Sequence, residues 1–322
     1  MIYISSIIAA AVTMLLTALF LHSSAARKIQ DVPNERSLHT KPIPRIGGVA
    51  LIAGVLSGWS VLTHALPWWI LMPVLLLFTV SIMDDMRGLS VRYRLLAHLL
   101  AAFMLVQGTG LFAQHVLPGM ALLLLVVWMT NLYNFMDGSD GLAGGMAFIG
   151  FGIYGIAALH AQYVPFALLN FSIVAAAAGF LYFNFYPAKI FMGDAGSIPL
   201  GFLAAAMGLW GMLIGLWPAW FPLLVFSPFI VDASVTLLKR ALRKEKIWQA
   251  HREHYYQRLV QLGWGHRKTA LAEYGLMLAA GSSALLAVWK PVHAGGILLS
   301  WGLIFLILML LIERLWKKRT HE

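Results

Sequence analysis

A succession of long apolar segments along nearly the whole chain is the feature that most constrains its fold. An α-helix needs about 20 apolar residues to cross the hydrocarbon core of a bilayer. Hydrophobic residues make up 60% of the 322 residues and charged residues 11%, and the mean hydropathy is +0.79. We therefore predict an all-α, polytopic membrane protein, folded as a single transmembrane domain over residues 1–322. The eleven predicted spans are 2–22, 46–64, 67–83, 95–110, 117–135, 142–160, 162–182, 198–216, 219–238, 270–289 and 294–313.

The basic residues fix the predicted orientation of these spans. Of the 23 Lys and Arg residues, 22 fall in alternate loops, and only Lys290 falls in a loop of the other set. Cytoplasmic loops carry the excess of basic residues in membrane proteins. We therefore predict a periplasmic N-terminus and a cytoplasmic C-terminus, which requires an odd number of spans. The net charge of +10, which in a soluble chain would indicate nucleic-acid binding, has the same explanation. The first basic loop contains Arg27, Lys28, Arg36, Lys41 and Arg45.

The first apolar segment is predicted to remain as an anchor helix. The small residues at 23–26 resemble a signal-peptidase site. In a signal peptide, however, positive charge precedes the apolar core, whereas here Arg27 and Lys28 follow it.

The stretch 131–145 is the most unusual part of the chain, because polar groups directly follow an apolar run. Asn131, Asn134, Asp137 and Asp140 recur at intervals of three and lead into four glycines. Carboxylates at or within a membrane are energetically unfavourable and indicate function by default. Glycine lets the backbone approach a ligand or a neighbouring helix closely. A polar loop ended by glycines is the simpler alternative.

An adjacent pair of carboxylates, Asp84 and Asp85, ends the third predicted span. Such a pair repels itself unless a cation or a proton lies between its members. Arg87, Arg92 and Arg94 follow within ten residues and can supply part of that charge. Mg²⁺ is a second source, since it prefers one or two carboxylates together with substrate phosphate and water. The alternative is a solvated helix cap.

Two shorter polar islands combine a basic residue with tight turns. Lys41 and Arg45 flank two prolines and precede a glycine pair, so they can hold an anion; an ordinary positive-inside loop is the alternative. Asp194 lies in a Gly-Asp-x-Gly-Ser turn, with Lys189 five residues upstream. Asp194 can equally be a helix cap.

The longest polar segment, 239–268, contains two histidines. His251 and His254 are three residues apart and would share one face of a helix. That spacing can hold zinc, but no third ligand of the usual type stands nearby, and the chain has no cysteine. We therefore favour phosphate binding through His and Arg, with Arg252 and Arg258 close by. An amphipathic interfacial helix with its charges in water is the alternative.

The acidic residues indicate on which side a site lies. All 13 Asp and Glu residues fall in the predicted cytoplasmic segments or at their ends. A transporter usually places charge near the bilayer midplane on broken helices, so this distribution favours an enzyme with a cytoplasmic site over a lipid or sugar-phosphate transporter. A non-catalytic scaffold would need no such acids. Asp232 is expected simply to pair with Lys239 or Arg240.

In chain order, these islands resemble the polyprenyl-phosphate N-acetylhexosamine-1-phosphate transferases, glycosyltransferase family 4. The resemblance rests on four motifs: Lys-Pro-Ile-Pro-Arg-Ile-Gly-Gly at 41–48, the Asp84-Asp85 pair, the Asn-x-x-Asn-x-x-Asp-x-x-Asp-Gly run from 131, and Phe-Met-Gly-Asp-x-Gly-Ser at 191–197. It implies transfer of a sugar 1-phosphate from a UDP-sugar to a membrane polyprenyl phosphate such as undecaprenyl phosphate. UMP is released, and Mg²⁺, or else Mn²⁺, is required.

The resemblance also implies roles for individual residues. Asn134 and Asp194 match magnesium ligands, and Asp140 matches a uracil-contacting position. Asp84, Asp85 and Asp137 are the expected catalytic residues, the first two beside the lipid phosphate. The expected substrate-binding residues are Lys41, Arg45, Arg94, Asn131, Asp140, Lys189, His251, Arg252, His254 and Arg258.

The histidine run indicates a branch of the family. Some members carry His-x-His-His, whereas here His254 is followed by Tyr-Tyr-Gln, with His251 and Arg252 ahead of it. This resembles the branch that starts O-antigen chains of lipopolysaccharide, and not the peptidoglycan pentapeptide enzyme. The resemblance implies a GlcNAc-like or 6-deoxy-HexNAc donor and a place in the bacterial inner membrane; a homodimer is one possible assembly. Direct attack and a phospho-aspartyl intermediate both stay open.

Reporter fusions test the predicted orientation. A fusion just after Leu66 should report a periplasmic location, because the basic loops on either side of that point are predicted to be cytoplasmic. A fusion after the basic cluster at 314–319 should report the cytoplasm. A cytoplasmic signal from the first fusion would overturn the topology.

Overall fold

A computed structural model describes residues 3–33, 37–246, 249 and 251–321 of the chain. Arg36, predicted to lie in the first basic loop, is outside the described residues. Most of the described chain is helical. The helices are α1 (Ile4–His22), α2 (Ser24–Lys28), α3 (Gly47–Trp59), η1 (Ser60–Ala65), α4 (Trp68–Arg87), α5 (Val91–Gly108), α6 (Leu111–Gln114), α7 (Val116–Phe135), α8 (Leu142–His160), α9 (Val164–Asn184), α10 (Asp194–Leu213), α11 (Trp220–Val225), α12 (Ser227–Leu242), α13 (Tyr255–Leu259), η2 (Val260–Trp264), α14 (Gly265–Trp289), η3 (Pro291–His293) and α15 (Ala294–His321).

The described residues include eight helices that are long and apolar enough to cross a membrane, which confirms an all-α, polytopic membrane protein. The count of eleven spans stays a prediction, because three of the predicted segments fall outside that set. The helix α3 has only 13 residues, and α5 carries Arg92 and Arg94 in its first turn. The segment 219–238 forms two helices, α11 and α12, which meet at Phe226 just before Pro228. Proline lacks the N–H that a continuous helix would need there.

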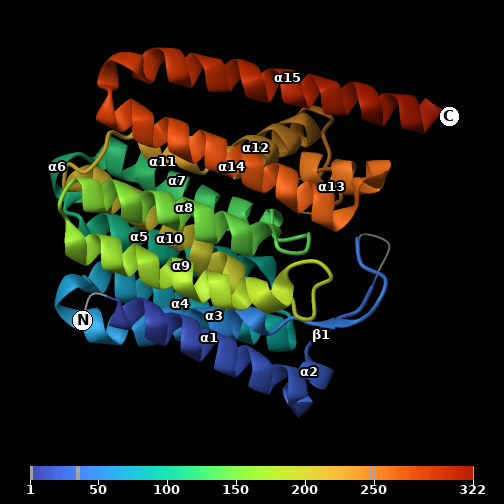
Figure 1. Cartoon of the computed structure of the whole chain (residues 1–322), viewed down its shortest axis with the longest axis horizontal. Coiled ribbons are helices and arrows are strands. Elements are labelled where there is room, and N and C mark those ends of the chain that lie inside the picture. The colour runs from blue at the N-terminus through green and yellow to red at the C-terminus, as the bar shows by residue number, and fades with distance from the viewer. Residues whose placement is uncertain (1–2, 34–36, 247–248, 250, 322) are drawn as a thin grey trace.

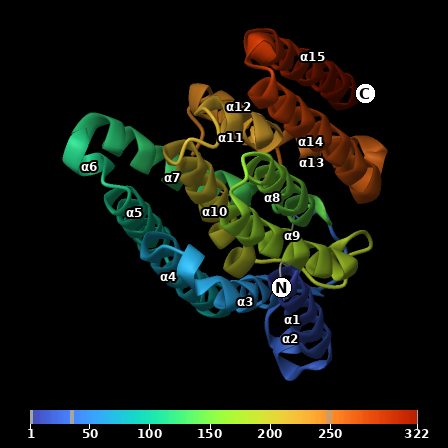
Figure 2. The same ribbon diagram turned by 60° about the vertical axis from the view of Figure 1, so that its left-hand side comes forward.

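The long helices lie side by side in one bundle (Figure 1). The helix α10 runs through the middle and α15 lies on the outside (Figure 2). Of the eight candidate spans, α10 is the most buried and α15 the least. The first helix begins at one end of the bundle and the last ends at the other (Figure 1).

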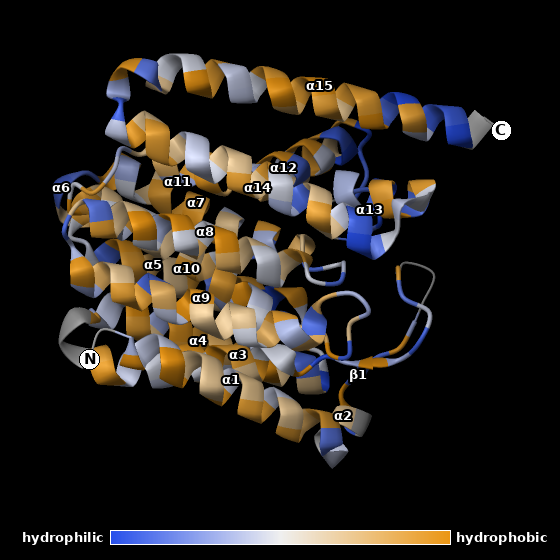
Figure 3. Ribbon diagram, viewed as in Figure 1, coloured by the Kyte–Doolittle hydropathy of each residue, from blue (hydrophilic) through white to orange (hydrophobic). Residues whose placement is uncertain are grey.

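Hydrophilic residues gather mainly at the right-hand end of the bundle in Figure 3. That end carries α2, the loops after α4, α7 and α9, and the long connection from α12 to α14 (Figure 1). It also carries a two-residue antiparallel ladder, in which β1 (Gln30–Asp31) pairs with β2 (Ile43–Pro44). Segments far apart in the chain therefore meet at one polar face.

A close approach of two glycines joins α3 to α10. The backbone N–H groups of Gly47 and Gly48 donate to the carbonyls of Phe191 and Met192, at 2.9 and 2.8 Å. A Cβ atom on Gly48 would stand 2.2 Å from the backbone nitrogen of Gly196. Only glycine fits here, and the contact fixes the loop 39–48 against the first turn of α10.

A pair of glycine variants tests this contact. Gly48→Ala should lower the free energy of unfolding by about 1–3 kcal/mol, because the added methyl group overpacks a crossing of two backbones. Gly152→Ala in α8 is the matched control, since the nearest atom to its Cβ would be 3.9 Å away. Alanine is the better helix former, so the control should be neutral or stabilising. Thermal unfolding in detergent, followed by tryptophan fluorescence, gives both values; equal shifts would contradict the assignment.

Candidate active site

The N-terminus of α10 is the centre of the polar face. The first N–H groups of a helix lack intrahelical partners and carry partial positive charge. Asp85, near the end of α4, accepts hydrogen bonds from the backbone nitrogens of Asp194 and Ala195, at 3.3 and 2.9 Å. A carboxylate from one helix thus caps another. Gly193 precedes them with φ of +70°, and a Cβ there would stand 2.6 Å from the Arg45 carbonyl oxygen.

Two arginines balance part of the negative charge around this helix end. Arg45 lies 3.4 Å from Asp85 Oδ1. Arg94 lies 3.1 Å from Asp84 Oδ2 and 3.5 Å from Asp194 Oδ2, so it joins α5 to both α4 and α10. Asp84 also accepts the Leu89 N–H at 2.6 Å. The adjacent carboxylates therefore do not share one cation, since each has an arginine of its own.

The end of α7 completes the cluster with an amide and a carboxylate. Asn134 Nδ2 donates to Asp194 Oδ1 at 2.9 Å and to Ser197 Oγ at 2.8 Å. Asp137 follows α7, and its pKa is raised well above the usual range by burial and then by the negative charges of Asp194 and Asp85. Four aspartates meet here against two arginines, so the cluster favours a further cation, or protons on some of its carboxylates.

A polar cavity of about 340 Å³ opens beside this cluster. Six residues predicted from the sequence line it: Arg45, Asn134, Asp137, Asp140, Asp194 and His251. The other lining residues, to which sequence analysis assigned no individual role, are Asp31, Ser37, Leu38, His39, Gly138, Ser139, Asn184, Phe191, Gly193, Gln257 and His266.

Hydrogen bonds between two loops form one wall of the cavity. Asp140 Oδ2 accepts the Ala188 N–H at 3.0 Å. Asn184 accepts the Gly141 N–H at 3.0 Å and donates to the Ile190 carbonyl at 2.9 Å. The loop after α7 and the loop after α9 are therefore bound to each other. The ring of Phe191, touched edge-on by His39 with ring centres 5.0 Å apart, adds an aromatic surface to this wall.

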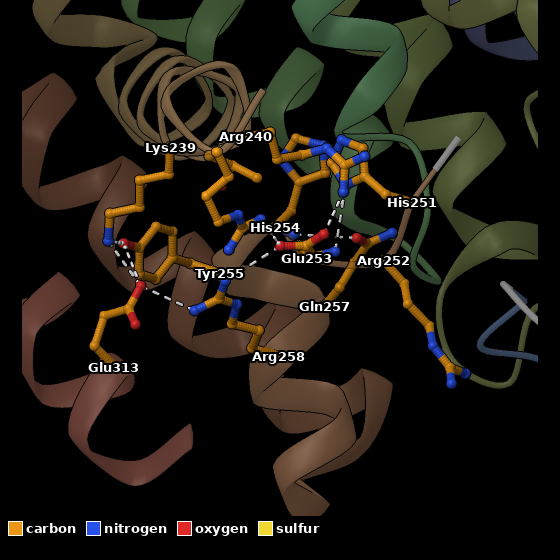
Figure 4. Close-up of polar contacts among 12 residues, drawn as sticks. Lys239, Arg240, His251, Arg252, Glu253, His254, Tyr255, Gln257, Arg258 and Glu313 are labelled. Carbon is orange, nitrogen blue, oxygen red and sulfur yellow. Dashed lines mark hydrogen bonds and ion pairs between the residues drawn. The ribbon is translucent and has the colours of Figure 1, made fainter. Parts of the chain in front are cut away.

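The remaining residues predicted to bind substrate do not line this cavity. Lys41, Lys189 and Arg252 are exposed, and Figure 4 shows Arg252 extending away from its neighbours. Asn131 donates to the Val127 carbonyl one turn back in α7, at 2.7 Å. Arg94, Asp84 and Asp85 also lie outside the lining. Arg94 contacts Asp194, and Asp85 caps α10.

Arg258 belongs to an ion-pair network that attaches α15 (Figure 4). Its Nη1 lies 2.9 Å from Glu313 Oε1. Lys239 and the Tyr255 hydroxyl contact the same carboxylate oxygen, at 2.7 and 3.0 Å. Glu253 forms ion pairs with Arg240 and Arg243 beside this network. Arg258 therefore contacts acids of the protein, whereas the sequence predicted contact with substrate phosphate.

The prediction for Asp232 was wrong. Its two carboxylate oxygens accept the backbone N–H groups of Tyr255 and Tyr256, each at 2.9 Å, so it caps α13. A carboxylate gains more from unpaired N–H groups at a helix start than from the flexible Lys239 or Arg240, which pair elsewhere.

The two histidines also differ from their predicted arrangement. The helix α13 begins at Tyr255, so His254 precedes the helix and His251 lies in the loop before it. Their rings are nevertheless neighbours, with centres 4.8 Å apart. Burial, His254 and Arg240 together lower the pKa of His251 to about 4. At neutral pH His251 is therefore uncharged and offers the cavity a hydrogen bond, not a positive charge.

The family of the chain follows from comparison with known proteins. The sequence profile of glycosyl transferase family 4 matches residues 67–212, a range that contains Asp84, Asp85, Asn134, Asp137 and Asp194. A relative from Bacillus subtilis is 31% identical over 88% of this chain and 81% of its own length. The chain belongs to glycosyl transferase family 4.

Three relatives illustrate the activities named within the family. The Bacillus subtilis protein is named a probable undecaprenyl-phosphate N-acetylglucosaminyl 1-phosphate transferase. A decaprenyl-phosphate N-acetylglucosaminephosphotransferase of Mycobacterium leprae is 27% identical over 83% of this chain and 79% of its own. A phospho-N-acetylmuramoyl-pentapeptide-transferase of Levilactobacillus brevis is 29% identical over 76% and 83%, respectively. All three names describe phosphotransferases, and the first two name a polyprenyl phosphate as well.

Proposed function

We propose that this protein transfers a HexNAc 1-phosphate from a UDP-sugar to a polyprenyl phosphate such as undecaprenyl phosphate, releasing UMP. The observation that carries the proposal is the capped N-terminus of α10, where a cluster of four aspartates and two arginines contributes Arg45, Asp137 and Asp194 to the lining of a polar cavity. Two anionic phosphates must meet in this reaction. Arg45 and a divalent cation held by the aspartates would lower their repulsion, and a fixed site would hold them in line.

The cavity suits the donor. Its volume of about 340 Å³ is within the range of small-ligand sites. Phe191 offers a flat apolar surface for a base, and Asp140, held by the Ala188 N–H, offers a carboxylate for the polar edge of a uracil. Arg45, Asn134 and Asp194 lie at the part of the lining that reaches α10, where a diphosphate would be bound.

An apolar groove suits the lipid acceptor. It has a volume of about 160 Å³ and lies between α7, α10, α11 and α12. Met129 and Leu132 line it, and Leu132 is two residues before Asn134 on the same helix. Met129 and Leu132 are the lining residues of α7 nearest in sequence to the aspartate cluster. We propose that it takes the isoprene units nearest the phosphate, with the rest of the chain in the bilayer.

The donor atoms of the cluster fit a magnesium ion. Within the described residues, no three His, Asp or Glu side chains form a metal site by themselves. Mg²⁺ takes one or two carboxylates and completes its shell with substrate phosphate and water. Asp194 would be the main ligand, with Asn134 beside it once the amide oxygen turns toward the ion. When bound, Mg²⁺ would neutralise charge on the diphosphate oxygens that become more negative as UMP leaves.

Asp137 is the best-placed proton acceptor. Within the described part of the chain its carboxylate makes no hydrogen bond or ion pair, whereas Asp84 and Asp85 hold Arg94 and the α10 N–H groups. We propose that Asp137 takes the last proton of the acceptor phosphate. A phosphate oxygen then attacks the phosphorus attached to the sugar, and its bond to UMP breaks.

We further propose a GlcNAc-like or 6-deoxy-HexNAc donor and a role in starting O-antigen or a related surface glycan. The names of two of the relatives support an N-acetylglucosamine donor. The O-antigen role rests on the residues around His251 and His254 alone. The proposed setting is the bacterial inner membrane, with the cavity facing the cytoplasm, as the basic loops indicate.

A lipid-transfer assay tests the activity. Membranes carrying the protein should move label from radioactive UDP-GlcNAc, UDP-GalNAc or a UDP-6-deoxy-HexNAc into butanol-extractable lipid. EDTA or Asp194→Ala should abolish transfer, because each removes the divalent ion from an oxygen-rich site. Full activity of Asp194→Ala, or in EDTA, would remove Asp194 from its role. Transport of the intact UDP-sugar without lipid labelling would favour the transporter alternative.

A second pair of variants distinguishes a catalytic role from a helix-capping role. Asp137→Asn should lower kcat by about 10²–10⁴-fold with KM for the UDP-sugar nearly unchanged, since it removes a general base. Asp85→Asn should instead lower the thermal unfolding midpoint, because it weakens the cap of α10. Steady-state kinetics and thermal unfolding of both variants give the result. Unchanged kcat in Asp137→Asn would return the base role to Asp84 or Asp85.

A further inference from the structure

His266, in the first turn of α14, contacts three separate walls of the cavity. Its Nδ1 lies 2.9 Å from Ser139 Oγ and 3.4 Å from the Asp140 backbone nitrogen, in the loop after α7. Its Nε2 lies 3.1 Å from the Leu38 carbonyl oxygen, in the loop between β1 and β2. Its ring stacks on Tyr186, in the loop after α9, with centres 6.0 Å apart and an angle of 12°.

These partners determine where the proton of the ring lies. The Leu38 carbonyl can only accept, so Nε2 must donate to it. The Asp140 backbone N–H can only donate, so Nδ1 must accept from it. The Ser139 hydroxyl can donate to Nδ1 as well. A ring with its hydrogen on Nε2 satisfies both sides at once, and the Asp140 carboxylate also lies beside the ring, with its Oδ1 3.7 Å from Nδ1.

The side chain stands on a rigid element. A second residue of α14, Tyr274, donates its hydroxyl to the Gly141 carbonyl at 2.6 Å. The two residues are eight positions apart, or about 12 Å along the helix at 1.5 Å per residue. The loop 137–141 is thus held by α14 at two points, and only the His266 point also reaches Leu38.

Each of the three walls carries a residue assigned to donor binding. The loop with Leu38 continues to Arg45, the loop with Ser139 contains Asp140, and the loop with Tyr186 continues to Phe191. A change in the distance between these loops therefore changes the cavity itself. Misplacement of positioning groups by about 1 Å can reduce binding and turnover strongly.

We propose that His266 is a positioning residue that holds the three walls of the donor cavity together and thereby sets the affinity for the uridine nucleotide. The inference rests on the proposed function, and it assigns His266 no contact with the reacting phosphates. The ring acts as a donor toward Leu38 and as a partner of Ser139 and Asp140 in the loop after α7.

Three substitutions of His266 remove the contacts of Nε2, the contacts of Nδ1, or both. In His266→Asn, the amide oxygen can replace Nδ1 and keep Ser139 and Asp140, but Leu38 is lost. In His266→Gln, the amide nitrogen can replace Nε2 and keep Leu38, but the other side is lost. His266→Ala loses both sides. His293→Ala is the matched control, since His293 is exposed, lies between α14 and α15, and is absent from the cavity lining.

The expected result is a graded loss of nucleotide affinity. A net hydrogen bond contributes about 1 kcal/mol, which is about fivefold in an equilibrium constant. We expect Kd for UMP and KM for the UDP-sugar to rise about fivefold in His266→Asn and His266→Gln, and about 20-fold or more in His266→Ala. The kcat and the KM for polyprenyl phosphate should stay within about twofold, and His293→Ala should match the wild type. Unchanged UMP affinity in all three variants, or a fall in kcat alone, would overturn the inference.

A spin label measures the mobility of the loop that contains Leu38, independently of enzymatic activity. The chain contains no cysteine, so Thr40→Cys, at an exposed position two residues after Leu38, accepts a single nitroxide. Its mobility should increase in the His266→Ala and His266→Asn backgrounds, but not in the His266→Gln or His293→Ala backgrounds. Equal mobility in all backgrounds would overturn the inference. If the wild type binds no UMP, the proposed function fails, whereas this measurement still decides whether His266 holds the loop.

Discussion

The partial positive charge at the start of α10 is the constraint on which the polar face depends. Asp85 caps this helix from α4, Arg94 reaches Asp194 from α5, and Asn134 reaches Asp194 from α7. Unpaired N–H groups buried at such a place would be destabilising. Asp85 satisfies them, and Arg94 and Asn134 bind the side chain of Asp194, so that four helices meet at one end of the bundle around the start of α10.

Two kinds of contact hold the polar face together. Between α3 and α10 the backbones meet at Gly48 and Gly196, where only glycine fits. Around Asp194 the contacts are between charged and polar side chains. The close backbone crossing positions α10, and the charged groups at its start are placed relative to that crossing.

The sequence predicted the helical bundle well, because each span is a run of apolar residues long enough to identify by itself. It also selected Asp194, Asn134 and Asp140, whose motifs are local. It did not predict that Asp85 caps another helix, that Asp232 caps α13, or that His266 lies between Leu38 and Ser139. Each of those contacts joins residues far apart in the chain. Only the pattern of charges at helix ends could have indicated the two caps, and nothing local distinguishes His266 from an ordinary residue of a basic segment.

The outer helix α15 is held differently from the rest of the bundle. It is the least buried of the candidate spans, and Glu313 binds Lys239, Tyr255 and Arg258 at its polar end. Exposed ion pairs are screened by salt, whereas apolar packing is not. Salt that screens the partly exposed Lys239–Glu313 pair should therefore loosen the polar end of α15. Arg258 and Tyr255 belong to α13, which also carries the cavity residue Gln257, so the Glu313 carboxylate joins the outer helix to the rim of the cavity.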